Sequence, residues 1–213
     1  MQAAVADAET DELLSEGQWL RARRLLFGQI LLFATLSLIA SFVLSYDALL
    51  LAGNPGVELN CSINVWIDCA KVGLTPQANL LGFPNAFLGL ASMPVVVTIA
   101  VAALAGTRFP RWFMLSANVG VLFGVGFAHW LLYQSTFVIG ALCPWCLLVL
   151  VSSIFMFIAT THWNILENNL YLPSAAHARA VGFVRGGWMA ITLIAWLAIL
   201  VVIEAIKWLP VVL

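Results

Sequence analysis

The chain has 213 residues, of which 63% are hydrophobic and only 9% are charged. Soluble domains average about 25% charged residues, so the composition excludes a soluble globular protein, which could not hide this much apolar surface from water. The formal net charge of −1 offers no basic surface for nucleic acid. We therefore expect an integral membrane protein whose solvent is the lipid bilayer.

Four stretches that lack Asp, Glu, Lys and Arg locate the membrane-spanning helices, because one span needs about 20 mainly apolar residues. They cover residues 25–46, 72–107, 112–161 and 186–203. The first and the last each fit one helix, and the second fits one at 85–106. The third is long enough for two helices, with a break near Gln134–Thr136 and Gly140. The pattern predicts an all-α protein with five spans, so its two termini would lie on opposite sides of the membrane.

The distribution of Lys and Arg orients these helices, since cytoplasmic loops are enriched in both. With the N-terminus inside, seven of the nine basic residues face the cytoplasm, and only Lys71 and Lys207 lie outside. The polar tail 1–24 and the loop 162–185 are then cytoplasmic, whereas the C-terminal end of the fifth helix (186–209) is extracytoplasmic. The tail lacks the basic start and cleavage site of a signal peptide, so we expect the first helix to remain as an anchor.

All four cysteines fall on one side of the membrane in this topology. Cys61 and Cys69 lie in the loop at 46–84, and Cys143 and Cys146 begin the fourth helix. That side is extracytoplasmic, where disulfides form and persist in a bacterium. An even number of cysteines in two close pairs indicates two dithiol/disulfide couples.

The second pair is the more informative one. Cys143-Pro144-Trp145-Cys146 is a Cys-x-x-Cys motif at the predicted start of a helix. Proline suits the first turn, and the free N–H groups and the positive dipole end there favour a thiolate. Burial at the bilayer edge would oppose this by raising the thiol pKa, and the sequence leaves the balance open. The motif favours a redox-active dithiol over a static disulfide or half of a metal site, which have the same spacing.

Cys61 and Cys69 have seven residues between them in the chain, a spacing that is common in purely structural disulfides. A second pair on the same face changes this interpretation, because electrons can pass between two pairs by thiol–disulfide exchange. Two other classes stay open on the residues alone. One is a protein that binds a metal through the four cysteines, and the other is a transporter with structural disulfides, although its spans would hold almost no ionisable residues.

Three runs of sequence together resemble the vitamin K epoxide reductase family, in its bacterial branch. They are Cys61-Ser62-Ile63-Asn64 through Cys69-Ala70-Lys71-Val72, Gly82-Phe83-Pro84-Asn85, and Ile139-Gly140-Ala141-Leu142-Cys143-Pro144-Trp145-Cys146. The similarity covers the first four predicted helices, at residues 25–161. The resemblance implies a catalytic four-helix transmembrane bundle around a quinone, and many bacterial members add a fifth helix, as here.

The resemblance also implies a function. Bacterial members lie in the inner membrane, reoxidise an extracytoplasmic thioredoxin-like (DsbA-like) protein and reduce a quinone, which would be menaquinone or ubiquinone. Some members carry a thioredoxin-like domain after the fifth helix, whereas this chain stops at Leu213. We therefore expect a separate partner protein.

When the residue roles of the family are carried over to the matching positions, the resemblance implies that Cys143 and Cys146 are the active-site couple, with Cys146 nearest the quinone. It makes Cys61 and Cys69 the shuttle couple between the partner and Cys143. No metal is implied.

Asn85 matches the asparagine that binds a quinone carbonyl in the family, and we expect Phe83 and Phe87 beside it to contact the quinone. From the residues alone, a helix cap next to Pro84 explains Asn85 equally well. Vertebrate members have a tyrosine where this chain has Leu150. This departure argues against vitamin K epoxide chemistry here.

Overall fold

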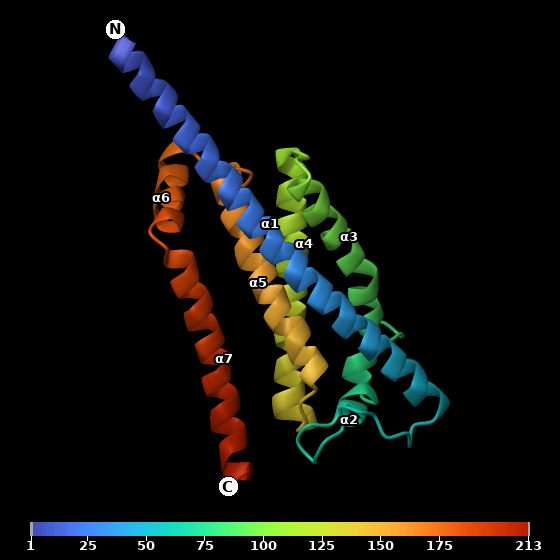
Figure 1. The fold of residues 1–213 in the computed structure, drawn as a ribbon. Helices are drawn as coiled ribbons and strands as arrows, with labels where there is room; N and C mark the ends of the chain where they lie inside the picture. The colour runs from blue at the N-terminus through green and yellow to red at the C-terminus, as the bar shows by residue number, and fades with distance from the viewer. Residues whose placement is uncertain (1, 213) are drawn as a thin grey trace.

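A computed structural model of the chain shows an elongated assembly of helices (Figure 1). The structure describes the backbone of residues 2–212 and the side chains of residues 16–209. Five helices are long and apolar enough to cross a membrane: α1 (Gln2–Gly53), α3 (Ala86–Leu104), α4 (Arg111–Tyr133), α5 (Pro144–Leu166) and α7 (Trp188–Val212). No β-strand occurs within residues 2–212. The predicted all-α membrane fold with five spans is therefore confirmed.

Four of the spans form a bundle. α1 runs obliquely across the others and packs along α3 and α5, while α4 packs on α5 (Figure 1). One apolar core joins Phe27 of α1, Ala100 of α3 and Trp163 of α5. Small residues bring α1 and α3 close together, since a Cβ added to Gly89 would lie 2.2 Å from Oγ of Ser41.

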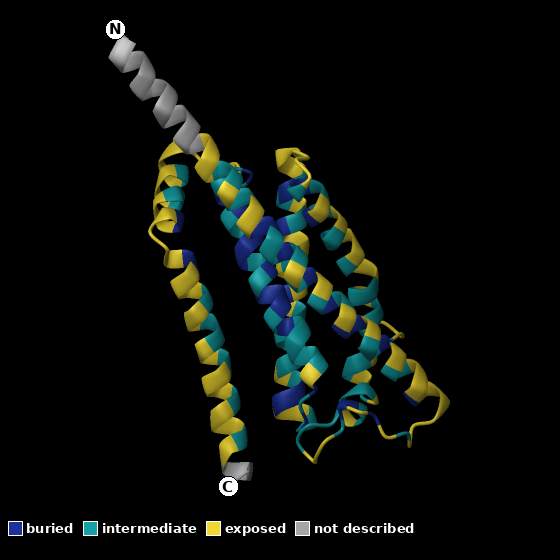
Figure 2. Ribbon diagram, viewed as in Figure 1, coloured by how far each residue is buried: buried dark blue, intermediate teal, exposed yellow. Residues whose placement is uncertain are grey.

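The fifth span lies at the side of this bundle. α7 follows a short helix, α6 (Ser174–Arg185), and contacts mainly α5 and α6. Most of its surface is exposed (Figure 2), as expected for a helix whose apolar side chains face lipid. Of the five spans, α7 has the smallest share of buried residues.

The helix bounds differ from the prediction at both ends of the first span. α1 is continuous through residue 24, so the proposed division between a polar tail and the bundle is not a break in the helix. The helix also continues beyond Tyr46 to Gly53, because the Ala and Leu residues after Asp47 favour helix. Asn54-Pro55-Gly56 then stops it, since a residue before proline disfavours the helical conformation.

The two predicted loops contain short helices of their own. The loop at 46–84 holds α2 (Cys69–Gly73) and the 3-10 turn η1 (Pro76–Asn79). The loop at 162–185 begins within the last turn of α5 and holds α6. Both loops therefore contain short helices that the apolar pattern of the sequence did not predict.

The break expected in the third apolar stretch is a change of helix type followed by a turn. The π-helical turn η2 (Gln134–Ile139) continues α4 and ends at Gly140, whose φ of 66° is left-handed. Glycine adopts that conformation without the steric cost of a Cβ. The turn sends the chain back toward α5 and so places the Cys-x-x-Cys segment at this end of the bundle.

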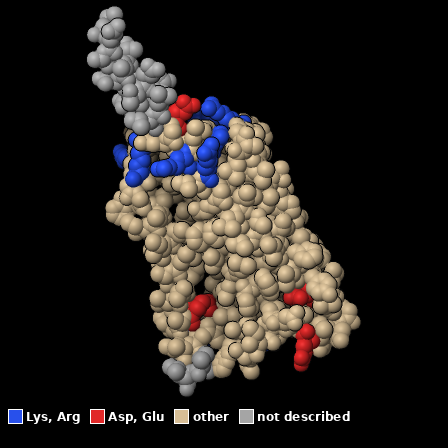
Figure 3. All heavy atoms as spheres, in the orientation of Figure 1, with Lys and Arg blue, Asp and Glu red and all other residues tan. Residues whose placement is uncertain are grey.

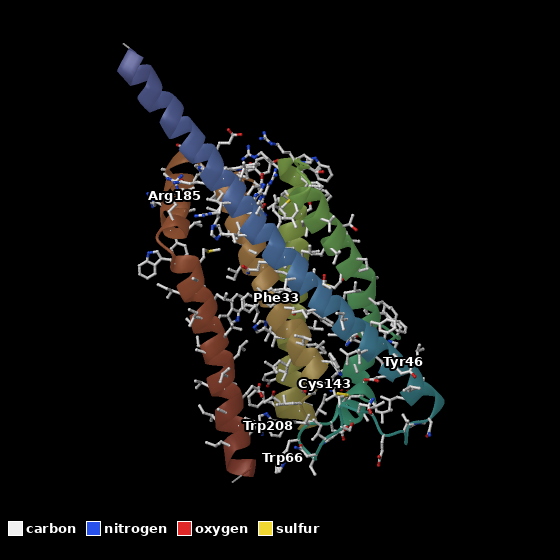
Figure 4. The ribbon with its side chains drawn as sticks, viewed as in Figure 1. Phe33, Tyr46, Trp66, Cys143, Arg185 and Trp208 are labelled. Carbon is white, nitrogen blue, oxygen red and sulfur yellow. A yellow bond between two sulfur atoms is a disulfide. The ribbon has the colours of Figure 1, made fainter. Side chains whose placement is uncertain are left out.

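Charged residues gather at the two ends of the molecule. Lys and Arg gather near the N-terminal part of α1, and the other visible end carries Asp and Glu (Figure 3). The guanidinium groups of Arg23 and Arg108 lie 4.9 and 5.2 Å from the ring centre of Trp19. Figure 4 shows Arg185 toward this basic end, with Cys143 and Trp66 toward the opposite end. The two ends of the chain also lie at opposite ends of the molecule (Figure 1).

Candidate active site

The cysteine loop is fixed to the segment before α5 by backbone hydrogen bonds. The Asp68 N–H donates to the Leu142 carbonyl over 3.0 Å, and the Leu142 N–H donates to the Trp66 carbonyl over 2.7 Å. Lys71 Nζ donates to the Gly140 carbonyl over 3.1 Å. These bonds set the register between the two segments, so that Cys69 lies beside Cys143.

Asp68 organises the start of α2 and therefore the position of Cys69. Its carboxylate accepts hydrogen bonds from the backbone N–H groups of Ala70 and Lys71 and from the Ser62 hydroxyl, at 2.6 Å for the last. Burial acts to raise the pKa of this carboxyl, but the Ser62 and backbone hydrogen bonds and the charge of Lys71 outweigh it, so the pKa is lowered. Asp68 is thus a helix cap that stays ionised.

The four sulfur atoms meet in one cluster. Cys61 and Cys69 form a disulfide, and Cys143 and Cys146 are free thiols. Cys143 Sγ lies 3.3 Å from Cys69 Sγ. Cys61, Cys69 and Cys143 are buried with Leu51 and Leu59 in an apolar core at this end of the bundle. The predicted pairing of the loop cysteines is confirmed, and Cys69 is the loop cysteine that contacts the Cys-x-x-Cys motif.

Cys143 is the N-cap of α5, and Pro144 occupies the first turn, as the motif predicted. The pKa of the Cys143 thiol is lowered, chiefly because the Cys146 thiol donates a hydrogen bond to its sulfur. Burial opposes this, whereas the N–H groups of Cys146 and Trp145 add to the lowering, and the charge of Asp47 raises the pKa. The opposing effects that the sequence left open therefore add up to a lowered pKa for the Cys143 thiol.

A cavity of about 620 Å³ lies inside the bundle next to the sulfur cluster. Its lining is largely apolar and includes Cys143, Cys146, Asn85, Ser37, Ser41 and Leu150. The side chains of Ser37 and Ser41 are buried and bring hydroxyl groups to this wall. An apolar space with a few polar groups at its wall suits a flat, apolar ring that carries carbonyl oxygens. The donor set therefore fits a quinone.

Asn85 lines this cavity but also has partners within the protein. Its Nδ2 donates to the Gln77 carbonyl over 2.6 Å, and its Oδ1 accepts from the Leu80 N–H over 3.2 Å. It is the N-cap of α3 without making a capping hydrogen bond. An amide nitrogen has two N–H groups, so one stays available for a carbonyl ligand.

Phe83 and Phe87 are not brought to the cavity. Their rings stack on each other with centres 6.4 Å apart, and neither residue lines the cavity wall. The structure therefore brings together the four cysteines and Asn85, and leaves the two phenylalanines beside this group.

Sequence reasoning missed three side chains that line the cavity or contact a sulfur. Ser37 and Ser41 lie four residues apart on α1, a spacing that indicates a shared helix face but gives no sign of a cavity. Asp47 Oδ2 lies 3.7 Å from Cys61 Sγ. The only signal for Asp47 was its position as the first charged residue after a long apolar run, and that was used to mark the end of a span.

Comparison with known protein families matches residues 29–161 to the Vitamin K epoxide reductase family. The matched segment extends from the first turns of the apolar part of α1 to the last turns of α5, and so contains the cavity and all four cysteines. A search of curated proteins found no match. Membership implies a membrane thiol–disulfide oxidoreductase with a redox-active centre. On the strength of this match over most of its length, the chain belongs to the vitamin K epoxide reductase family.

Proposed function

We propose that the protein is a membrane thiol:quinone oxidoreductase. It would reoxidise a separate thioredoxin-like (DsbA-like) protein outside the cytoplasm of a bacterium and reduce menaquinone or ubiquinone. The observation that carries the proposal is the distance of 3.3 Å between Cys69 Sγ and Cys143 Sγ. It supports electron transfer between the loop couple and the couple beside the cavity.

The first half of the route brings electrons in from the partner. A partner thiolate attacks Cys61 of the Cys61–Cys69 disulfide, and Cys69 leaves as a thiolate. The second partner thiol then displaces Cys61, so the partner becomes oxidised and both loop cysteines are reduced. We assign Cys61 to the partner because Cys69 is the one in contact with Cys143.

The second half moves the electrons to the cavity. Cys69 attacks Cys143 of a Cys143–Cys146 disulfide, and Cys146 leaves as a thiolate at the cavity wall. Cys61 then attacks Cys69, which re-forms the loop disulfide and releases Cys143. The lowered pKa of Cys143 makes it a good leaving group in this step.

Within the cavity, Asn85 and the hydroxyls of Ser37 and Ser41 would hold the quinone by hydrogen bonds, with Cys146 as the sulfur at the wall. A bound quinone supplies a two-electron, two-proton acceptor. The apolar lining excludes water and so keeps the released Cys146 sulfur from competing exchange with soluble thiols.

The membrane orientation belongs to the same proposal. The basic end of the molecule would face the cytoplasm and the cysteine end the opposite side, because cytoplasmic loops are enriched in Lys and Arg. The sulfur cluster would then meet its partner in an oxidising compartment. Residues 1–24 and 162–185 would be cytoplasmic, and α7 would end outside.

A count of thiols and quinone tests the proposal. The full-length protein is reduced, freed of reductant without oxygen, and mixed with excess short-chain quinone. The wild type should lose its four thiols and consume two quinones per chain. Cys146→Ser should consume quinone far more slowly than the wild type, because it lacks the sulfur at the cavity wall.

The double variant Cys61→Ser/Cys69→Ser serves as the matched control. It keeps the active-site couple and should consume one quinone per chain with loss of two thiols. Quinone consumption by Cys146→Ser at the wild-type rate would overturn the proposal.

A further inference from the structure

Asp47 is the carboxylate nearest the sulfur cluster. Oδ2 of Asp47 lies 3.7 Å from Sγ of Cys61, where the last turns of α1 pass over the cysteine loop. In the disulfide Cys61 carries no proton, so this distance is a contact. Once Cys61 is reduced, the same geometry allows its S–H to donate to the carboxylate.

The two carboxylates of the cysteine loop, Glu58 and Asp68, have different surroundings. The Asp68 carboxylate is occupied by Ser62 and by the backbone at the start of α2. Glu58 is exposed to solvent. Asp47 is half-buried and, within the described chain, its carboxylate makes no contact with a hydrogen-bond donor other than Cys61. Its carboxylate therefore contacts a sulfur on one side, caps no helix, and keeps partial access to solvent.

We propose that Asp47 is a catalytic residue that accepts the proton of Cys61 when Cys61 attacks Cys69. This inference rests on the proposed relay. The Cys61 S–H proton passes to Asp47, and the resulting thiolate forms a bond to Cys69 Sγ. The Cys69–Cys143 bond breaks, and its electron pair leaves on Cys143. The loop couple is thereby oxidised and the couple at the cavity reduced, while the proton on Asp47 passes to solvent.

The chemistry needs such a group. A cysteine thiol ordinarily has a pKa of about 8.5, so few unassisted thiols are ionised at neutral pH. Cys61 is only 7% exposed and lies among apolar side chains, so water has little access to its proton. A carboxylate in contact with the sulfur supplies the missing base.

The charged and titratable groups around Asp47 are few. The loop after α1 carries Glu58, and the α2 segment carries Asp68 and Lys71. The start of α5 carries Cys143 and Cys146, with His162 at its far end, and α3 has no ionisable residue. The charge of Asp47 is felt at Cys143, whose thiol pKa it raises.

A two-phase experiment tests the inference on the full-length protein. Fully reduced protein is mixed with excess short-chain quinone, and samples are quenched with an alkylating reagent. Peptide mapping then gives the redox state of each cysteine over time. The first phase is loss of the Cys143 and Cys146 thiols, and the second is formation of the Cys61–Cys69 disulfide, which requires the Cys61 attack.

Asp47→Asn should slow the second phase by roughly 10²-fold at neutral pH. It should not slow the first phase, because loss of the Asp47 charge lowers the pKa of the Cys143 thiol. Its second phase should then accelerate about tenfold per pH unit toward about pH 9, as Cys61 ionises without help. Asp47→Glu should recover much of the rate. Glu58→Gln, which changes an exposed carboxylate of the same region, should match the wild type in both phases.

Several outcomes would overturn the inference. If Asp47→Asn matches the wild type, Asp47 has no role in the step. If the variant is faster, the carboxylate only repels the Cys61 thiolate. If its second phase is slow at every pH, Asp47 has a structural role. Failure of the first phase in the wild type would instead contradict the proposed function itself.

Discussion

α5 and α7 are both long, apolar membrane spans, yet 44% of the spanning window of α5 is buried in the protein and only 6% of that of α7. α7 is the more apolar of the two. The buried positions of α5 include the polar residues Ser152, Thr160 and Asn164. In a bilayer, an apolar side chain gains little by moving from lipid into the protein interior. The buried helix is therefore the one whose small and polar residues pack between helices. The Cys-x-x-Cys motif lies at the start of the helix that has them.

The largest predicted effect comes from a substitution in the wall of the cavity, in the bundle to which α5 belongs and α7 does not. Gly120 of α4 lines the cavity, and a Cβ added there meets nothing within 4 Å. Gly120→Leu should therefore project into the quinone space and raise the quinone KM by about 10–200-fold. Steady-state quinone reduction would measure it.

Gly126→Leu provides the control for that experiment. Gly126 lies on the same helix, also has open space around a Cβ, and does not line the cavity. It should keep the wild-type KM. Equal effects of the two substitutions would mean that the cavity is not the quinone site.

A second prediction concerns the close packing within the bundle. In Gly89→Ala the new Cβ would meet both Oγ and Cβ of Ser41, at 2.2 and 3.0 Å, so rotation of the hydroxyl alone does not relieve the contact. We expect a loss of about 1–3 kcal/mol in the free energy of unfolding, measured by thermal unfolding in detergent. Gly28→Ala, where a Cβ has no neighbour within 4 Å, should not be destabilised.

A third prediction concerns the cap of α2. Asp68→Ala should destabilise this turn by about 0.5–2 kcal/mol, seen as faster hydrogen exchange at the Ala70 and Lys71 amides. Because the pKa of Asp68 is lowered in the folded protein, the carboxylate's contribution is complete above its ordinary value of 3.8. It is lost as the pH falls through the lowered value.

Asp68→Asn is the matched variant for this cap. Asparagine also caps helices well, so the protection of these amides from exchange should stay near the wild type at neutral pH. It should no longer fall at acid pH, because asparagine does not titrate. If Asp68→Ala and the wild type exchange alike at neutral pH, Asp68 does not hold the turn.

The smallest predicted effect lies on α7. Trp196 Nε1 donates to His129 Nε2 over 3.0 Å, and Thr136 Oγ1 donates to Glu204 over 2.9 Å, which ties α7 to α4 and η2. Trp196→Phe should cost about 0.6 kcal/mol of stability and leave quinone reduction unchanged. Trp208→Phe, which loses a bond only to Glu204 of its own helix, should cost less. A large loss of activity in Trp196→Phe would bring α7 into the catalytic unit.

The features that the sequence predicted well depend on local patterns. Gaps between charged residues predict the five spans, and Gly140 and the Cys-x-x-Cys motif predict the turn and helix start at Cys143. The family resemblance rested on contiguous motifs, and the matched family confirms it.

The features that it did not predict depend on distant contacts. The choice of Cys69 over Cys61 as the neighbour of Cys143 follows from hydrogen bonds between Trp66–Asp68 and Leu142, far apart in the chain. Phe83 and Phe87 lie two residues on either side of Asn85 in the chain, yet their rings stack on each other and neither lines the cavity. Glu204 likewise accepts a hydrogen bond from Thr136, which is far from it in the chain, and another from Trp208.

The most direct test of the relay is to map the disulfide that forms when each couple keeps one cysteine. Two double variants, Cys61→Ala/Cys146→Ser and Cys69→Ala/Cys146→Ser, are treated with a mild oxidant and analysed by non-reducing peptide mapping. The 3.3 Å contact predicts a rapid Cys69–Cys143 disulfide in the first variant and slow or absent Cys61–Cys143 linkage in the second. Equal or faster linkage of Cys61 to Cys143 would contradict the route through Cys69.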